Sequence, residues 1–189
     1  GRELEECLEV AREMERCGVH AMVLSGGVAS NAPMYVMRGR MPIHSMTHYM
    51  KQLWLKYGVR MVGRVMIPSV PFKELYFLED AKVFREELKL PLVYVGGVVS
   101  RQNAEQVLDI EGFDFVQMGR ALLNEPDFVN RMMEEKDHRC GCDHVNYCIA
   151  RMYSREMACH KHCTDLPPGI RREIEKVKRL NSKIEGKSK

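Results

Sequence analysis

The spacing of apolar residues predicts that the chain opens with a helix. Over residues 2–17, apolar side chains recur every three or four positions between charged ones, at Leu4, Cys7, Leu8, Ala11 and Met14. Side chains spaced in this way share one face of an α-helix, and a glycine favours the end of a helix. We therefore expect an amphipathic helix that ends at Gly18.

Three short, mostly apolar runs predict strands, at residues 19–24, 91–95 and 113–118. The first run shows no alternation of apolar with polar residues, which is typical of a strand buried on both faces of a parallel sheet. Helical patterns follow over residues 73–89, after Ser100 as an N-cap, and from about Pro126. Strands and helices that alternate in this way indicate parallel pairing with right-handed crossovers, which is the α/β class.

The pattern is less regular between the first strand and the helix over residues 73–89. Proline and glycine residues interrupt the front of residues 28–57, and a short helix that contains Trp54 fits residues 45–57. Residues 59–67 are apolar enough for a further strand, which Pro68 would end.

The composition is that of a globular protein whose charges are balanced. The chain has 189 residues, of which 45% are hydrophobic and 29% charged, with a net charge of +3. A dedicated nucleic-acid-binding protein carries a basic stripe, so no nucleic-acid partner is expected. No apolar run approaches the roughly 20 residues that a membrane-spanning helix needs, and we expect no membrane partner. Seven cysteines without a secretion signal argue against a disulfide framework and indicate a reducing, cytoplasmic setting, with Cys7 and Cys17 buried.

Glycine residues follow the predicted strands, at the edge of the sheet where α/β enzymes carry their chemistry. Gly96 and Gly97 follow the second run, and Gly119 and Arg120 follow the third. Glycine lets main-chain amides approach an anion closely, and an arginine can hold two phosphate oxygens. These residues predict a phosphate site, although either glycine site taken alone also fits a tight turn. The G-x-G-x-x-G fingerprint of dinucleotide-binding folds is absent.

Residues around these glycines resemble a known family. The stretches are LPLVYVGGV (residues 90–98), GFDFVQMGRALL (112–123) and PDF (126–128), with a lead-in helix at PFKELYF (71–77). They are similar to the closing strands of the NADH:flavin oxidoreductase (Old Yellow Enzyme) family, in its 2,4-dienoyl-CoA reductase-like branch. The similarity covers about residues 1–135.

This resemblance implies a flavin mononucleotide (FMN) site in a (β/α)8 barrel. The family binds the FMN phosphate at the ends of its seventh and eighth strands, a role that falls by position to Gly96, Gly97, Gly119 and Arg120. Ser25, with Gly26 and Gly27, would end the sixth strand near the flavin or the substrate. NAD(P)H would be the co-substrate, and an electron-poor alkene or unsaturated thioester the substrate.

The resemblance further implies that the chain is the C-terminal half of a TIM barrel (residues 1–135), followed by a Cys/His-rich segment (136–165) and a basic C-terminal helix or tail (166–189). Most contacts to the flavin ring, and the catalytic residues, belong to the family's first five strands. They are expected upstream of Gly1. Because half a barrel leaves sheet edges and core side chains exposed, we expect an N-terminal half-barrel as a partner.

The cysteine segment contains Cys142, Cys148 and Cys159 as candidate metal ligands. Relatives with a [4Fe–4S] cluster after the barrel carry four cysteines, and here Val145 stands in the place of the second. Three alternatives stay open: a cluster completed by Cys140 or Cys163, a zinc site that includes nearby histidines, or a remnant without metal.

Three functions are compatible with these patterns. The first is an FMN-dependent NAD(P)H oxidoreductase, to which this chain contributes the strands that bind the phosphate. The second is another barrel enzyme that acts on a phosphorylated substrate, because the same glycine sites would serve it. The third is a half-barrel without catalytic activity.

Overall fold

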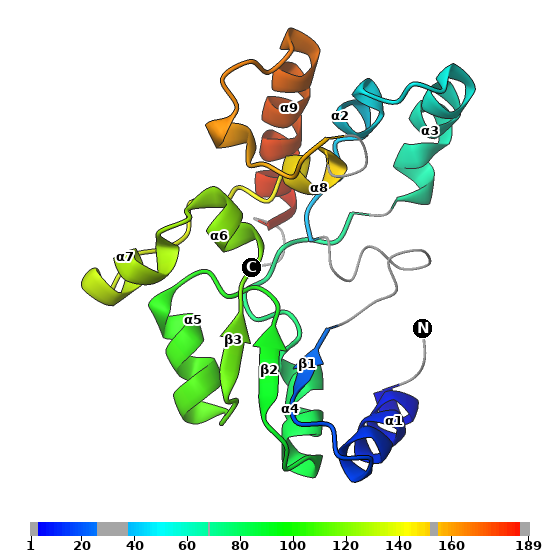
Figure 1. Ribbon diagram of the computed structural model, residues 1–189. Coiled ribbons are helices and arrows are strands. Elements are labelled where there is room, and N and C mark those ends of the chain that lie inside the picture. Colours follow the sequence, from blue (N-terminus) through cyan, green and yellow to red (C-terminus); the bar gives the residue numbers. More distant parts are fainter. Residues whose placement is uncertain (1–3, 26–37, 68, 152–154, 186–189) are drawn as a thin grey trace. The chain divides into compact units, whose positions relative to one another are not determined.

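The computed structural model describes residues 4–25, 38–67, 69–151 and 155–185. The chain divides into two compact units (Figure 1). The sheet unit consists of Gly1–Val36 and Lys73–Cys140, and the helical unit of Met37–Phe72 and Gly141–Lys189. The sequence analysis expected a continuous barrel piece over residues 1–135, whereas residues 37–72 form a unit with the C-terminal part of the chain.

The sheet unit contains a three-stranded parallel sheet in the order β1-β2-β3. Its strands are β1 (Met22–Leu24), β2 (Leu92–Val95) and β3 (Phe115–Gln117). All three lie within the apolar runs that predicted strands, so the α/β class and the parallel pairing are confirmed. In the described part of the chain the sheet has these three strands, and the larger barrel remains a prediction.

The helices of the sheet unit are α1 (Leu4–Arg16), α4 (Leu78–Glu87), α5 (Arg101–Glu105), which continues as the π-helix η2 (Gln106–Ile110), α6 (Arg120–Asn124) and α7 (Phe128–Glu134). α1, α5 and α7 begin close to the predicted positions, whereas α4 begins five residues later than predicted, after a turn over residues 74–77, and α6 was not predicted. Gly18 follows α1 with a φ of +85°, a conformation that glycine adopts without steric cost. Ser100 caps α5 as predicted, since its side chain accepts a hydrogen bond from the amide of Asn103, at 3.2 Å.

One face of the sheet packs against the core and the other is open. Leu92 and Tyr94 of β2 are fully buried in a cluster with side chains of α1, α4, α5 and η2. On the opposite face, Val23, Val93 and Phe115 lie in one row across the three strands. Val23 and Phe115 are exposed and Val93 is half-buried. Strands with apolar side chains on both faces are typical of a sheet that is covered on both sides.

The helical unit contains α2 (Ile43–His48), α3 (Leu53–Met66), α8 (Tyr147–Arg151), the 3-10 helix η3 (His160–His162) and α9 (Pro168–Glu185). The strand predicted over residues 59–67 is wrong, because α3 continues to Met66. Leu55, Val59 and Gly63, spaced by four, are half-buried or buried, whereas the residues just before them are exposed, so the period is helical. Among the described helices, none is long and apolar enough to cross a bilayer.

Glu173 joins α9 to the first turn of α2 within the helical unit. Its carboxylate accepts hydrogen bonds from the amide of His44 (2.8 Å), the amide of Ser45 (2.7 Å) and the Ser45 hydroxyl (2.8 Å). The first amides of a helix have no partner inside it, and a carboxylate satisfies them and their partial positive charge. An apolar core of Val145, Tyr147, Ile170, Ile174 and Val177 lies along α9.

Candidate functional site

The ends of all three strands lie at one edge of the sheet. Val95 pairs with Gln117, so Gly97 and Gly119, each two residues after its member of this last pair, follow neighbouring strand ends at one edge of the sheet. Leu24 pairs with Tyr94, which puts Ser25 at the same edge. The sequence analysis predicted that the glycine pairs share an edge, and parallel pairing brings them there. Gly26 and Gly27 lie outside the described residues.

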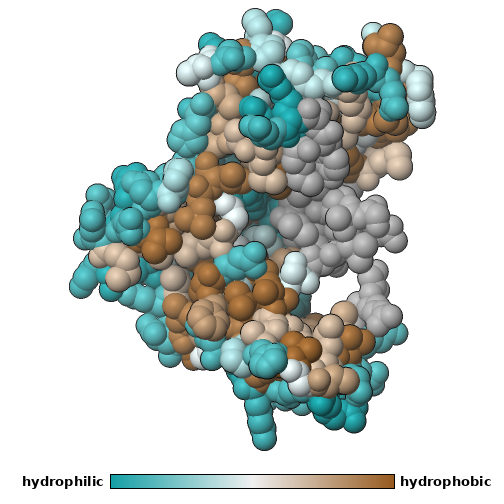
Figure 2. Space-filling view, in the orientation of Figure 1, coloured by the Kyte–Doolittle hydropathy of each residue, from teal (hydrophilic) through white to brown (hydrophobic). Residues whose placement is uncertain are grey.

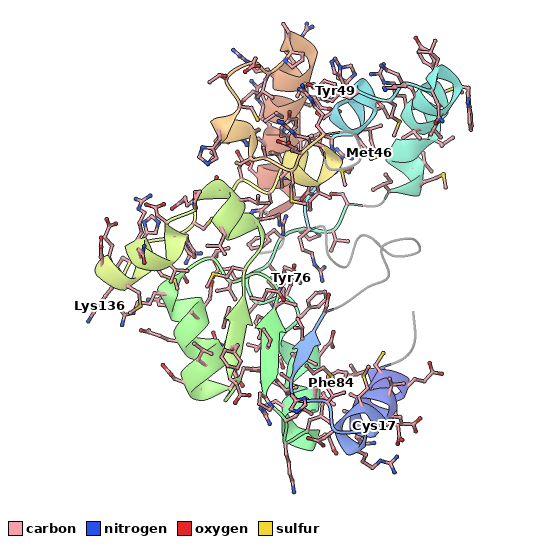
Figure 3. The ribbon with its side chains drawn as sticks, viewed as in Figure 1. Cys17, Met46, Tyr49, Tyr76, Phe84 and Lys136 are labelled. Atoms are coloured by element: carbon pink, nitrogen blue, oxygen red, sulfur yellow. The ribbon has the colours of Figure 1, made fainter. Side chains whose placement is uncertain are left out.

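Gly96 and Gly97 are required by the packing of the turn over residues 73–77. Both have positive φ angles, +136° and +76°. A Cβ atom at Gly96 would lie 2.8 Å from Cδ2 of Phe77, and one at Gly97 would lie 2.7 Å from the amide nitrogen of Leu75. The sequence analysis assigned these glycines to the approach of an anion. Their immediate role in the structure is to admit this turn, whose Tyr76 is labelled in Figure 3.

Three hydrogen bonds stabilise the region where the 73–77 turn meets the loop after β2 and α5. The amide of Leu75 donates to the carbonyl of Gly97 (3.2 Å), and the hydroxyl of Tyr94 donates to the carbonyl of Gly96 (2.7 Å). The side-chain amide of Asn103 donates to Glu74 (2.9 Å). Burial raises the pKa of Tyr94, although a hydrogen bond with the backbone of Phe77 lowers it in part. Tyr94 therefore remains a neutral donor.

Gly119 differs from the other two glycines because the space beside it is open. Its φ is −105°, and among the described residues, its chain neighbours aside, no atom lies within 4 Å of where a Cβ would stand. Gly119 is exposed, and Arg120 next to it is half-buried in the first turn of α6. A small ligand can therefore approach the main chain at this strand end, with a guanidinium group on the adjacent residue.

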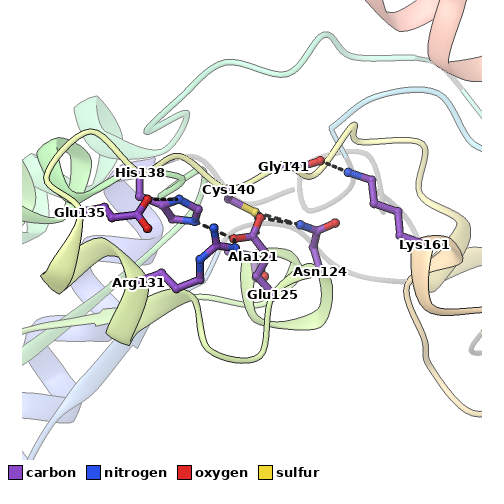
Figure 4. A network of polar contacts seen from close by, with 9 residues as sticks. All are labelled: Ala121, Asn124, Glu125, Arg131, Glu135, His138, Cys140, Gly141 and Lys161. Carbon is purple, nitrogen blue, oxygen red and sulfur yellow. Dashed lines mark hydrogen bonds and ion pairs between the residues drawn. The ribbon is translucent and has the colours of Figure 1, made fainter.

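A network of polar and charged side chains connects the C-terminal end of α6 with α7 and the loop after it (Figure 4). Nε2 of His138 lies 2.7 Å from Oε2 of Glu125, and Nη1 of Arg131 donates to the same oxygen at 3.2 Å. Nδ2 of Asn124 donates to Oε1 of Glu125 at 3.0 Å. The His138 and Glu125 side chains are largely buried. The network ties the end of α6, α7 and the following loop together, and so restrains the helix that begins at Arg120. No local sequence pattern pointed to it, because its members are brought together by the α6–α7 turn.

The three candidate metal ligands lie on different segments of the helical unit. Cys142 precedes α8, Cys148 lies on α8, and Cys159 is the N-cap of η3. Burial raises the pKa of the Cys159 thiol, which disfavours the thiolate that binds metal. Nη1 of Arg151 donates to Sγ of Cys163 at 3.0 Å. Cys163 is one of the two cysteines considered as a substitute ligand.

The described residues do not fit an iron–sulfur cluster or a zinc site. Within them, no group of three or more His, Cys, Asp or Glu side chains is arranged to hold a metal ion. Val145, which stands where the related clusters have a cysteine, is buried in the apolar core along α9. Cys140, the other substitute considered, hydrogen bonds instead within the sheet unit, to the carbonyl of Ala121 (3.9 Å). No metal is therefore used in the function proposed below.

One other expectation about titratable side chains is wrong, because Cys7 and Cys17 are exposed, not buried. Cys17 lies at the end of α1 (Figure 3). His44 and His48 on α2 are half-buried, and burial is the main cause that lowers the pKa of both.

Asp143 and His160 form an ion pair that the sequence analysis missed. Nε2 of His160 lies 3.1 Å from both carboxylate oxygens of Asp143, and Nζ of Lys178 lies 3.7 Å away. Burial raises the pKa of Asp143, but the hydrogen bond and charge of His160, with Lys161 and Lys178, outweigh it, so the pKa is lowered. The pair connects the loop before α8 to η3.

Comparison with known proteins links the chain to reductases. No protein-family model matches it, and no solved structure does. It is 36% identical over 152 residues to 4,4'-dithiodibutanoate disulfide reductase of Rhodococcus erythropolis, a match that covers 80% of the chain and 37% of that enzyme. Bilirubin reductase of Mediterraneibacter gnavus is 29% identical over 100 residues (52% of the chain, 14% of the relative). NADH:acrylate oxidoreductase of Vibrio harveyi is 35% identical over 48 residues (25% and 5%).

The chain spans little more than a third of the length of the first of these relatives, and less of the others. All three are named as reductases or oxidoreductases. The similarity therefore supports a redox enzyme as the general class of the protein.

Proposed function

We propose that this chain contributes the phosphate-binding strand ends of an FMN-dependent NAD(P)H oxidoreductase. The observation that carries the proposal is the parallel register of β2 and β3, which brings the strand ends before Gly97 and Gly119 to one edge of the sheet, with Arg120 as the residue after Gly119. Two adjacent strand ends of this kind form the phosphate site of many barrel enzymes. The similarity to three reductases favours a redox cofactor over a phosphorylated substrate as the bound group.

Gly119 and Arg120 are the residues best suited to hold the phosphate. The open space beside Gly119 admits an oxygen close to the main chain, and the Arg120 guanidinium supplies a charge-assisted hydrogen bond. Gly96 and Gly97 act indirectly, by admitting the 73–77 turn that supports the neighbouring strand end. We assign a contact with the flavin or the substrate to Ser25, which follows β1 at the same edge of the sheet. Bound FMN would accept a hydride from NAD(P)H and pass it to the substrate.

The exposed apolar face of the sheet supports the proposal that further strands complete a barrel around this site. Val23 and Phe115 are apolar and exposed, and Val93 lies between them in the same row. In a complete barrel this face would form the interior, covered by the side chains of other strands. We assign those strands, the contacts to the flavin ring and the catalytic residues to an N-terminal half-barrel. The region of similarity is a small share of each relative, which is compatible with such a division.

The substrate proposed is an electron-poor alkene or an unsaturated thioester. Such an acceptor takes up a hydride at one carbon and a proton at the other, so that NAD(P)H is oxidised and the double bond is reduced. One relative is named for acrylate and another for a disulfide, and these are chemically different two-electron acceptors. The two acceptors are compared by measuring NAD(P)H oxidation by the purified protein, once with an acrylate-type alkene and once with a disulfide. Turnover of the disulfide alone would contradict the alkene assignment.

Flavin retention tests the site directly. We expect the chain, purified together with its N-terminal half-barrel, to carry FMN, identified by chromatography after heat release, and Arg120→Ala to weaken its binding. Removing a charged hydrogen-bond donor costs about 1–3 kcal/mol, or roughly 5- to 150-fold in Kd. The matched control is Arg16→Ala, because Arg16 is exposed at the far end of α1 and pairs with Glu13. A protein without flavin, or equal FMN binding by Arg120→Ala and the wild type, would contradict the proposal.

A further inference from the structure

The outward face of α3 is a continuous apolar surface. Seven side chains spaced by one, three or four residues are exposed, with exposed fractions from 48% (Val62) to 87% (Val65). They are Leu53, Trp54, Tyr57, Met61, Val62, Val65 and Met66, which we call the α3 face. Apolar side chains are visible on the surface over α3 in Figure 2. Single exposed apolar residues are ordinary, but a contiguous patch of them marks an interaction site.

Contacts on the other side of α3 fix which face points outward. Gly63 is buried against α2, where a Cβ atom would lie 3.3 Å from Cδ1 of Ile43. Nζ of Lys56 donates to the carbonyl of His48 (2.9 Å), and Nε of Arg60 donates to Oγ1 of Thr47 (2.8 Å). The helix therefore turns Lys56 and Arg60 toward α2, and among the described residues the α3 face stays exposed.

The segment around α3 carries positive charge alone. Residues 37–72 contain no Asp or Glu, and their charged residues are Arg38, Arg40, Lys51, Lys56, Arg60 and Arg64. Arg40 and Lys51 are exposed. A partner that covers the α3 face would thus meet an apolar strip within a segment whose charged side chains are all cations.

We propose that the α3 face binds the surface of a bilayer that contains anionic lipids. A helix with Trp, Leu and other apolar side chains on one face and cations on the other lies in the membrane interface, with the apolar face among the upper acyl chains. Trp and Tyr are enriched at that depth, and cations are attracted to anionic headgroups. A protein partner usually requires about one hydrogen bond per 100–200 Å² of interface, and the α3 face offers few polar groups for this purpose.

This attachment needs no membrane-spanning segment. The sequence analysis expected no membrane partner because no apolar run is long enough to span a bilayer, whereas an interfacial helix lies in the plane of the surface. The proposal is independent of the flavin site, which lies in the sheet unit, and a variant of α3 leaves Arg120 unchanged.

Trp54 makes the proposal testable, because it is the single tryptophan of the chain and lies on the α3 face. The full chain is titrated with vesicles of phosphatidylglycerol and phosphatidylcholine, and in parallel with vesicles of phosphatidylcholine alone. With the anionic vesicles we expect the Trp54 emission to shift to shorter wavelength and the protein to sediment with the lipid. With the zwitterionic vesicles binding should be weaker by about tenfold or more, because the headgroup attraction is lost.

Substitutions test whether vesicle binding depends on the α3 face or on non-specific adsorption of the protein to lipid. Val65→Glu should reduce vesicle binding by about tenfold or more, because a carboxylate replaces an apolar side chain at an anionic interface. The matched control is Ile110→Glu, at a residue that is 76% exposed on η2 in the sheet unit, and its vesicle binding should equal that of the wild type. Circular dichroism checks that both variants keep their helices.

Three results would overturn the proposal. The first is an unchanged Trp54 emission at saturating anionic lipid, and the second is equal loss of binding in Val65→Glu and Ile110→Glu. The third is a short-wavelength emission protected from acrylamide before any lipid is added, because a protein surface or a second copy of the chain would then cover the α3 face.

Discussion

The hydroxyl of Tyr94, buried in the core of the sheet unit, donates a hydrogen bond to the carbonyl oxygen of Gly96 at 2.7 Å. The two residues flank Val95, the last residue of β2. The bond fixes the course of the chain at this strand end, where the 73–77 turn packs onto the two glycines. A core side chain thus positions the edge of the sheet at which the phosphate site is proposed.

Removal of this hydroxyl should destabilise the sheet unit. Tyr94→Phe keeps the ring but leaves the carbonyl of Gly96 without its donor, which costs about 1–3 kcal/mol of unfolding free energy. Urea unfolding, with hydrogen exchange to follow the amides of β2, measures the change. Tyr57→Phe is the control, since Tyr57 is exposed on α3, and its stability should be unchanged within about 0.5 kcal/mol. An equal effect of the two substitutions would rule out this role for the Tyr94 hydroxyl.

The glycines at the two strand ends should respond differently to alanine. Gly97→Ala forces a side chain to a φ of +76° and places its Cβ 2.7 Å from the amide nitrogen of Leu75, so we expect a loss of about 2 kcal/mol or more. Gly119→Ala meets no atom within 4 Å, and stability should change by less than about 0.5 kcal/mol.

Flavin binding should show a different pattern for Gly119→Ala. Its methyl group would occupy the space proposed for a phosphate oxygen, so FMN retention should fall although the protein stays folded. Thermal unfolding and flavin titration of the same samples measure the two effects. Unchanged FMN affinity in Gly119→Ala would place the phosphate elsewhere.

The Asp143–His160 pair should make the stability of the helical unit depend on pH. The pKa of Asp143 is lower in the folded protein than the ordinary Asp value of 3.8. Its ionised form therefore stabilises the fold above that value, and the contribution disappears as the pH falls through the folded pKa. Asp143→Asn should cost about 1–3 kcal/mol near neutral pH and much less in acid.

Thermal unfolding of wild type and Asp143→Asn from about pH 7 to pH 3 checks this prediction. The control is Asp165→Asn, because Asp165 is exposed and its hydrogen bond is to the adjacent Thr164. A constant difference between wild type and Asp143→Asn across the whole range would exclude the proposed pH dependence.

Glu173 should be needed for the attachment of α2 to α9. Glu173→Ala leaves the amides of His44 and Ser45 and the Ser45 hydroxyl without their acceptor, which should lower the stability of the helical unit by about 1–3 kcal/mol. Hydrogen exchange at the first amides of α2 should increase in the same variant. Glu175→Ala, two residues along α9 at an exposed position, serves as the control and should leave this exchange unchanged. Similar exchange in both variants would contradict the role of Glu173.

The sequence by itself determined those features that depend on residues close together in the chain. Helical spacing predicted α1, three apolar runs predicted the three strands, and Ser100 was identified as an N-cap. The order of strands and helices was enough to place Gly97 and Gly119 at one edge, because parallel strands connected by helices end on the same side.

The tertiary structure alone decided the features that depend on contacts between distant residues. Ser45 and Glu173 are 128 residues apart, and their contact belongs to a unit that no local pattern could delimit. Glycine is needed at positions 96 and 97 because the 73–77 turn packs against them, not because an anion approaches there. Val145 replaces the expected cysteine at a position that is buried in the apolar core along α9. Residues 59–67 are apolar enough for a strand or a helix, and their packing against α2 selected the helix. Local spacing limits the conformations that a segment can adopt, but burial against the rest of the chain selects among them.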